Sequence, residues 1–304
     1  MGRKRGAAAG QLSFFDIELP PNDAEQVAET IIEAEPEPVR YNFATVPASE
    51  YDYTDRPVNV PTINELVKLI EKCLYRVGAH EFLADLFEIG AIAISNQFDK
   101  VRAPKREKQY LQIINKYDKD TQQKIVEVFA KVYCLLSQQI HPAVGFGDYL
   151  GELYMRSETS NAKTGQFFTP YDISKMCAEV AVDETLVKEY MEQDKIITLS
   201  EPACGSGGMI LAAADVLYNK YHFNISRNLY VECSDIDRRC VHMCYLQLSL
   251  AGIPAVIYQQ NTLTLETWDR WETPAYIMQW LRFRSLNQKQ RDRNEKAKEK
   301  SQLY

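Results

Sequence analysis

A glycine-rich turn after a short apolar strand is the feature of this sequence best suited to binding a ligand. An apolar segment from Ile196 to Ser200 leads into Glu-Pro-Ala-Cys-Gly-Ser-Gly-Gly, residues Glu201 to Gly208, and then into the apolar run Met209 to Leu217. In an α/β sheet this order of elements predicts a phosphate or nucleoside site. Glycines let the backbone approach a ligand closely, and a helix start offers unpaired N–H groups. The pattern alone is not specific, because a tight strand-to-helix turn often needs glycines for its geometry.

A second group of residues with binding potential precedes the turn. The segment from Gly165 to Pro170 reads Gly-Gln-Phe-Phe-Thr-Pro. Proline suits the first turn of a helix, so a helix is expected to begin near Pro170. Phe167 and Phe168, two aromatic rings just before that helix, would cover a flat ligand. Taken alone, each phenylalanine would be an ordinary core residue.

Acidic residues follow a second predicted strand. This strand is expected over Asn228 to Cys233, and it ends at Ser-Asp-Ile-Asp. A carboxylate just past the end of such a strand accepts hydrogen bonds from ribose hydroxyls. We therefore predict Asp235 as the ribose ligand, with Asp237 as the alternative. A third strand is expected over Ala255 to Tyr258.

With these motifs, the chain resembles the N-6 adenine-specific DNA methyltransferases, in particular the modification subunits of type I restriction systems, from Asp148 to about Leu263. The resemblance implies S-adenosylmethionine as cofactor and DNA as partner. In that family the counterpart of Gly165 to Pro170 contacts the cofactor, and the counterpart of the glycine turn wraps its methionine part. The cofactor-binding residues implied are Gly165, Gln166, Phe167, Phe168, Thr169, Pro170, Glu201, Pro202, Ala203, Gly205, Ser206, Gly207, Asp235, Ile236, Asn261 and Thr262.

The chain departs from the family at the loop that holds the target base. Adenine methyltransferases of this type carry an Asn-Pro-Pro-(Tyr/Phe) loop for the flipped adenine, and this tetrapeptide does not occur here. The nearest counterpart is Thr273-Pro274-Ala275-Tyr276, which lacks the amide and follows the acidic, tryptophan-rich stretch Glu266 to Glu272. Losing an amide that positions a weak nucleophile raises the barrier to transfer. We therefore assign no catalytic residue, and Thr273, Pro274 and Tyr276 are only degenerate candidates.

The predicted fold class is α/β, with a partial methyltransferase (Rossmann-like) sheet preceded by a helical bundle. Residues 1–60 are rich in acids and proline and predict a disordered arm, and apolar residues at helical spacing over 61–145 predict the bundle. The basic stretch from Arg102 to Lys108 is expected as a loop, either solvated or touching a phosphate backbone. Residues 146–276 form the predicted methyltransferase-like unit, with three strands of the seven that a full fold needs, and 277–304 a basic polar tail.

A short peptide in the arm suggests a protein partner. Gln11, Leu12, Phe14 and Phe15 resemble the peptide by which bacterial DNA-processing proteins dock on the replication sliding clamp. In such peptides a glutamine anchors the backbone and the following hydrophobic residues fill a groove. The alternative is a chance apolar cluster, because matches to five residues arise easily.

Composition limits the remaining choices. The 304 residues carry a formal net charge of −7, which argues against a uniformly basic nucleic-acid coat but leaves room for a basic patch. Seven cysteines in no regular framework, and no apolar run long enough for a bilayer, predict a cytoplasmic chain without a membrane partner. No metal site is expected, because Cys233, Cys240 and Cys244 do not have the spacing of zinc ligands.

These observations predict an S-adenosylmethionine-binding protein of DNA modification, in a restriction-modification or mobile-element setting, that is not catalytic by itself. A second subunit would then complete the methyltransferase fold. One alternative is an inactive, methyltransferase-like module that binds DNA or serves in regulation or assembly. Another is an RNA or small-molecule methyltransferase, against which the Gly-Gln-Phe-Phe-Thr-Pro segment argues.

Overall fold

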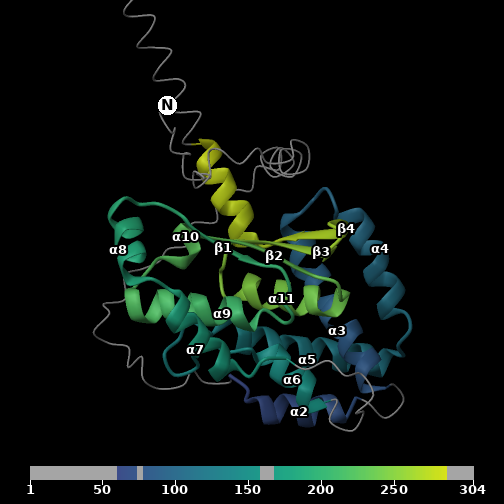
Figure 1. The fold of residues 1–304 in the computed structure, drawn as a ribbon. Helices are drawn as coiled ribbons and strands as arrows, with labels where there is room; N and C mark the ends of the chain where they lie inside the picture. Colours follow the sequence, from purple (N-terminus) through teal and green to yellow (C-terminus); the bar gives the residue numbers. More distant parts are fainter. Residues whose placement is uncertain (1–59, 74–77, 158–167, 286–304) are drawn as a thin grey trace, which may run out of the picture.

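The computed structural model describes residues 60–73, 78–157 and 168–285. In this part of the chain a four-stranded sheet follows a set of helices and carries helices on both faces (Figure 1). The α/β class and the helical bundle before the sheet are therefore confirmed. The peptide at Gln11 to Phe15 lies outside the described residues, and docking on the clamp stays a prediction.

Seven helices precede the first strand in the described ranges, and five of them come before the Gly-Gln-Phe-Phe-Thr-Pro segment. Helix α2 begins with a capping box in which Thr62 and Glu65 satisfy each other's backbone N–H groups, as their spacing predicts. The basic stretch after Val101 is helical, so our expectation of a loop was wrong, and its Arg106 side chain is buried. These first five helices are α2 (Ile63–Glu71), α3 (Ala79–Phe98), α4 (Ala103–Ile114), α5 (Lys119–Ser137) and α6 (Tyr149–Ser157).

The sheet has the order β1-β2-β3-β4. Strands β1 (Ile197–Glu201), β2 (Leu229–Asp235) and β3 (Ala255–Asn261) are parallel, so their carboxyl ends meet at one edge of the sheet. Strand β4 (Glu266–Glu272) returns antiparallel to β3, with an irregularity at Gln259 and Gln260. Within the described residues β1 pairs with β2 alone and lies at the side of the sheet.

Strand β4 corrects the sequence-based expectation of three strands. Its residues, Glu-Thr-Trp-Asp-Arg-Trp-Glu, give no apolar run, but its final residues are buried. A helix over residues 274–285 follows, so the beginning of the segment expected as a polar tail is packed instead. Tyr276 and Ile277 of this helix are buried against Tyr230 and Val256. The helix covers the sheet face opposite α11 and is yellow in Figure 1.

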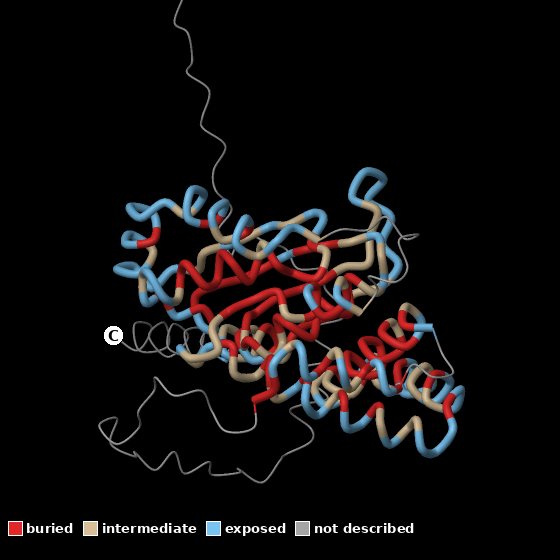
Figure 2. The backbone as a smooth tube through the Cα atoms, turned by 90° about the horizontal axis from the view of Figure 1, so that it is seen from below, coloured by how far each residue is buried: buried red, intermediate tan, exposed pale blue. Residues whose placement is uncertain are grey.

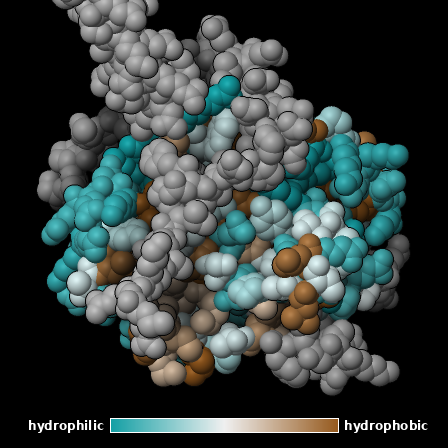
Figure 3. Space-filling model, turned by 45° about the horizontal axis from the view of Figure 1, so that its top comes forward, coloured by the Kyte–Doolittle hydropathy of each residue, from teal (hydrophilic) through white to brown (hydrophobic). Residues whose placement is uncertain are grey.

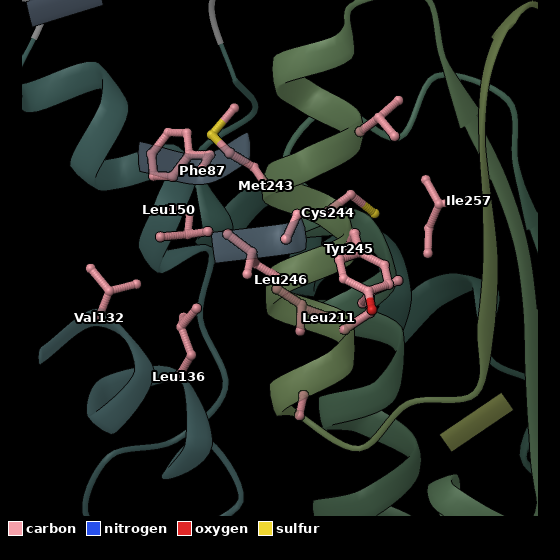
Figure 4. Packing of buried hydrophobic residues seen from close by; sticks show 14 of the residues in the cluster. Phe87, Val132, Leu136, Leu150, Leu211, Met243, Cys244, Tyr245, Leu246 and Ile257 are labelled. Atoms are coloured by element: carbon pink, nitrogen blue, oxygen red, sulfur yellow. The ribbon is translucent and has the colours of Figure 1, made fainter. Parts of the chain in front are cut away.

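Helix α11 (Arg238–Leu250) joins the sheet to the helical part. It is buried on nearly every side, and in Figure 4 Met243 and Leu246 point toward α3 and α6 while Cys244 and Tyr245 point toward β3. One continuous hydrophobic core therefore runs from the first helices to the sheet. The other helices around the sheet are α7 (Tyr171–Ala181), α8 (Glu184–Glu192), α9 (Gly208–Asp215), the π-helix η1 (Val216–Lys220) and α10 (Ile225–Asn228).

Burial follows this arrangement. The buried backbone lies in the sheet and in the helix faces turned toward it, whereas outer helix turns are exposed (Figure 2). On the face shown in Figure 3, the apolar residues that are not under grey atoms lie in small separate groups among polar ones. No helix in the described ranges has both the length and the apolar character needed to cross a membrane.

Thr273 connects β4 to the start of β3, and its replacement by valine tests that connection. Its side chain is fully buried, accepts a hydrogen bond from Ala255 N at 2.9 Å and donates one to Ile253 O at 2.8 Å. Thr273→Val would leave buried backbone groups without partners, so we expect a loss of about 2 kcal/mol in the free energy of unfolding. Urea denaturation measures it, with Thr267→Val on the exposed part of β4 as the matched control. Equal stability of both variants would contradict this role.

Candidate functional site

The glycine turn lies at the carboxyl ends of the parallel strands. Gly205 and Gly207 have φ values of +53° and +100°, in the region that side chains disfavour, and Gly207 is the residue before α9. A Cβ atom at Gly205 would lie 3.2 Å from the Phe168 ring, and one at Gly207 would lie 3.2 Å from Cys244 Sγ. Both glycines are therefore required for this conformation and for the close packing around it.

The turn is tied to the two neighbouring strands. Cys204 N donates to Ser234 O at 2.9 Å, and the carbonyl of Pro202 accepts hydrogen bonds from the hydroxyls of Ser234 and Thr262. Asn261 accepts from the backbone of the following turn through its side-chain oxygen. Motif residues that are far apart in sequence are thus brought together at one end of the sheet.

Asp235 faces this turn from the end of β2. Its Oδ2 accepts from Gly205 N at 2.9 Å, and its Oδ1 accepts from Asp237 N at 2.8 Å. Burial raises the pKa of Asp235 above its ordinary value. The alternative, Asp237, caps the start of α11 and forms an ion pair with Arg239. Of the two acids, Asp235 is the one that lies against the glycine turn.

Phe168 packs beside the turn from the segment before α7. Its ring meets Tyr154 edge to face, with 5.8 Å between the ring centroids. Thr169 and Pro170 follow it and are exposed. Gly165, Gln166 and Phe167, the other members of this motif, lie outside the described residues. Of the two aromatic rings that the sequence predicts as a cover for a flat ligand, Phe168 is the one that the structure describes.

A cavity of about 210 Å³ lies between these elements. Ligand pockets for small molecules commonly enclose about 300 to 1,000 Å³, so this cavity is smaller than a typical pocket for a whole small-molecule ligand. Ile236, at the end of β2, is 60% exposed there. The cavity is lined by Asp148, Phe168, Thr169, Ser174, Ala203, Cys204, Gly205, Ser206, Gly208, Met209 and Asp235.

Sequence reasoning missed two polar residues of this cavity. Asp148 comes from the residue before α6 and Ser174 from α7, and both are buried. Each is separated from the glycine turn by a long stretch of chain and belongs to no motif with an assigned polar role. The run Asp148 to Tyr154 was part of the resemblance, but no pattern within it shows that the carboxylate points at Ser206.

The degenerate catalytic candidates lie at the other end of the sheet. Thr273 and Tyr276 are buried, and Thr273 is hydrogen bonded to Ala255, the first residue of β3. The glycine turn follows the last residue of β1. The structure therefore does not bring Thr273, Pro274 or Tyr276 to the cavity.

Three cysteines, one of them in the glycine turn itself, lie close together. The sulfur atoms of Cys204, Cys233 and Cys244 lie within 4.8 Å of one another and are buried, so Cys204 takes the place in this group that the sequence suggested for Cys240. Burial raises the pKa of the Cys233 thiol well above its ordinary value, which keeps this thiol protonated. The absence of a metal site stays a prediction.

A larger cavity, of about 400 Å³, lies at the amino ends of the strands and includes Tyr218, His222 and Gly252. It contains none of the predicted motif residues. The chemistry expected from the sequence thus concentrates at the smaller cavity beside the glycine turn.

Comparison with known sequences identifies the family. Residues 146–303, just over half of the chain, match the family model described as N-6 DNA Methylase. The chain belongs to the N-6 DNA methylase family. The matched region begins just before α6 and contains the glycine turn, Asp235 and all four strands. Membership confirms the resemblance inferred from the sequence motifs.

One relative of this family member is a subunit of a restriction enzyme. The chain is 27% identical over 129 residues to the type I restriction enzyme MpnII methylase subunit of Mycoplasma pneumoniae (strain ATCC 29342 / M129 / Subtype 1). That match covers 41% of this chain and 22% of the relative, so the chain spans about a fifth of the relative's length.

Two solved structures are similar at low TM-scores. A class I S-adenosylmethionine-dependent methyltransferase from Listeria monocytogenes is 14% identical with a TM-score of 0.37, and the match covers 66% of this chain and 54% of that one. A type I restriction-modification system methyltransferase subunit from Streptococcus thermophilus is 18% identical with a TM-score of 0.36, and the match covers 81% and 48%.

Proposed function

We propose that this N-6 DNA methylase family member binds S-adenosylmethionine at the cavity beside the glycine turn. The observation that carries the proposal is the contact between the turn and Asp235, which places a carboxylate at the carboxyl end of β2 and open N–H groups at the start of α9. These groups suit the ribose and the charged end of the cofactor. Gly205 fits the same ligand, because it lines the cavity and its positive φ value disfavours any side chain that would narrow it.

The proposed biological role is adenine modification of DNA in the cytoplasm, in a restriction-modification or mobile-element setting. It is supported by the family and by the name of the relative, a methylase subunit of a type I restriction enzyme. We further propose that methyl transfer needs a partner subunit that supplies the base-binding loop. The chain has no Asn-Pro-Pro-aromatic segment, and its nearest substitute lies away from the cavity.

The missing loop also supports a second candidate function. In this alternative the chain is an inactive methyltransferase-like module that binds DNA or serves in regulation or assembly. Transfer of a labelled methyl group from S-adenosylmethionine to DNA separates the two. Transfer in the presence of a partner subunit supports the first, and transfer by this chain alone would contradict our proposal that it is not catalytic by itself.

Calorimetric titration with S-adenosylmethionine tests the cofactor site. We expect saturable binding by the wild type and binding about 10-fold to 100-fold weaker for Asp235→Ala, because hydrogen bonds to a charged group contribute about 1.5 to 3 kcal/mol. The control is Glu192→Ala, which removes an exposed acid from α8 and should leave the affinity unchanged. Thermal unfolding of both variants shows whether the fold is retained. A wild-type chain that does not bind the cofactor refutes the proposal.

A further inference from the structure

Asp148 places a buried carboxylate on the wall of the proposed cofactor cavity. Only 8% of the residue is exposed. Its Oδ2 accepts a hydrogen bond from Ser206 Oγ at 2.5 Å, and its Oδ1 accepts from Gln247 Nε2 at 2.8 Å and from Gly151 N at 3.0 Å. These contacts hold the carboxylate between α6, the glycine turn and α11. Its position is therefore fixed before any ligand binds.

The groups that contact this carboxylate in the described part of the chain are neutral hydrogen-bond donors. Among the described residues, no Lys, Arg or His side chain forms an ion pair with Asp148. Burial raises the pKa of Asp148 above its ordinary value, which means that its charge is only partly compensated by the hydrogen bonds. A buried charge is normally paired, so a cationic group that enters the cavity would supply the counter-charge for Asp148.

Two further features of the same cavity point to a ligand with more than one polar group. The hydroxyl of Ser174 lines the cavity, is fully buried and has no hydrogen-bond partner among the residues that the structure describes. The start of α9 lies next to Asp148, since a Cβ atom on Gly208 would be 3.0 Å from Asp148 Oδ2. A helix start attracts anions, whereas Asp148 attracts cations. Because they lie side by side, the helix start could bind the carboxylate of an amino acid while Asp148 binds its ammonium group.

We propose that Asp148 is the counter-charge for the ammonium group of the cofactor's amino-acid part, with the start of α9 and Ser174 receiving its carboxylate. This inference rests on the proposed binding of S-adenosylmethionine and assigns the small cavity to one end of that molecule. The cavity volume of about 210 Å³ agrees with this assignment, because it suits a fragment of the cofactor. Asp235, on the side of β2, would then serve the opposite, nucleoside end.

The competing interpretation is that Asp148 only stabilises the turn, because it also accepts from the first turn of α6 through Gly151. Two ligands distinguish these roles. S-adenosylhomocysteine carries the ammonium, and 5′-methylthioadenosine lacks the whole amino-acid part. We expect Asp148→Asn to weaken S-adenosylhomocysteine about 10-fold or more and 5′-methylthioadenosine less than about 3-fold, since only the former loses a charge-assisted bond. Equal weakening of both ligands overturns the inference and leaves the proposed function standing.

Ser206→Ala is the matched control. It removes the 2.5 Å hydrogen bond to Asp148 while keeping the carboxylate charge, so the preference for S-adenosylhomocysteine over 5′-methylthioadenosine should persist. Loss of that preference in Ser206→Ala would contradict a direct role of the charge.

A measurement on the wild type alone covers the case in which Asp148→Asn does not fold. The analogue of S-adenosylhomocysteine in which hydrogen replaces the amino group should bind about 10-fold more weakly than S-adenosylhomocysteine itself. Equal affinities overturn the assignment of Asp148. If the wild type binds neither S-adenosylmethionine nor these nucleosides, the proposed function itself fails.

Discussion

Arg106→Met is expected to lower the free energy of unfolding by about 3 kcal/mol, because removing one partner of a buried ion pair leaves the other charge uncompensated. The Arg106 side chain is 2% exposed and lies 3.0 Å from Asp99 Oδ2. It also donates to Arg270 O at 2.8 Å and stacks 3.8 Å above the Trp271 ring. The variant thus loses the contacts that connect α4 to β4. Arg102 still pairs with Asp99, which places the loss at the lower end of the usual range for such pairs.

Two variants make this prediction specific. Lys105→Met removes an exposed positive charge from the neighbouring position of α4 and should change stability by less than about 0.5 kcal/mol. Combining Asp99→Asn with Arg106→Met should cost less than the sum of the two single changes, since both then remove the same interaction. Additive losses in chemical denaturation would show that Arg106 and Asp99 are not coupled.

Arg106 also shows where sequence reasoning failed. Arg102, Lys105 and Arg106 form a basic run that favours a solvated surface or a phosphate contact. Its acidic partner is only seven residues away, but Arg270 and Trp271 lie more than 160 residues further along the chain. Nothing local indicates that one of these bases is buried. Long-range packing also explains why β4 was missed. Its Trp271 packs on Arg106 of α4 and on His242 and Tyr245 of α11, and its Arg270 and Glu272 pair with each other, so the strand is packed without an apolar run.

The three parallel strands were predictable because their signals are local in the sequence. Each is a short apolar run, and each ends in residues whose types already indicate a turn or a ligand. The glycine turn could be predicted because its positive φ values demand glycine at fixed positions. Asp235 followed because parallel strands end at the same edge of the sheet. These features depend on a few neighbouring residues and on one rule of topology.

Asp148 and Ser174 could not be predicted in this way. The hydrogen bonds of Asp148 reach 58 residues to Ser206 and 99 residues to Gln247. They exist because α11 packs between the helical part and the sheet (Figure 4). Gln247 of α11 donates both to Asp148 and to the carbonyl of Ser206, which connects the start of α6 to the glycine turn. The motifs thus predicted the glycine turn and Asp235, whereas the part of the cavity wall formed by Asp148 and Ser174 depends on how the whole core packs.

A second large effect is expected in acid, where His242 should lower the stability of the folded chain. This histidine is fully buried on α11, with its ring 4.9 Å from that of Trp271. Burial lowers its pKa from 6.5 to about 3, and the positive charges of Arg238 and Arg106 act in the same direction. Below pH 6.5, His242 binds a proton in the unfolded chain but not in the folded chain. Stability should fall by about 1.4 kcal/mol per pH unit from about 6.5 to about 3, reaching about 3 kcal/mol near pH 4.5.

The measurement must isolate His242, because buried acids act with the opposite sign. Burial raises the pKa of Glu272, so the folded chain binds that proton more readily than the unfolded chain and gains stability as the pH falls. We therefore compare the wild type with His242→Gln and His242→Leu by urea denaturation between pH 7.5 and 4.5. The wild type should lose stability relative to both variants as the pH falls, by the same amount for each, since neither can take up the proton. A stability difference that stays constant with pH would contradict the prediction. It would mean that His242 has the same pKa in the folded and unfolded chains, despite its burial near Arg238 and Arg106.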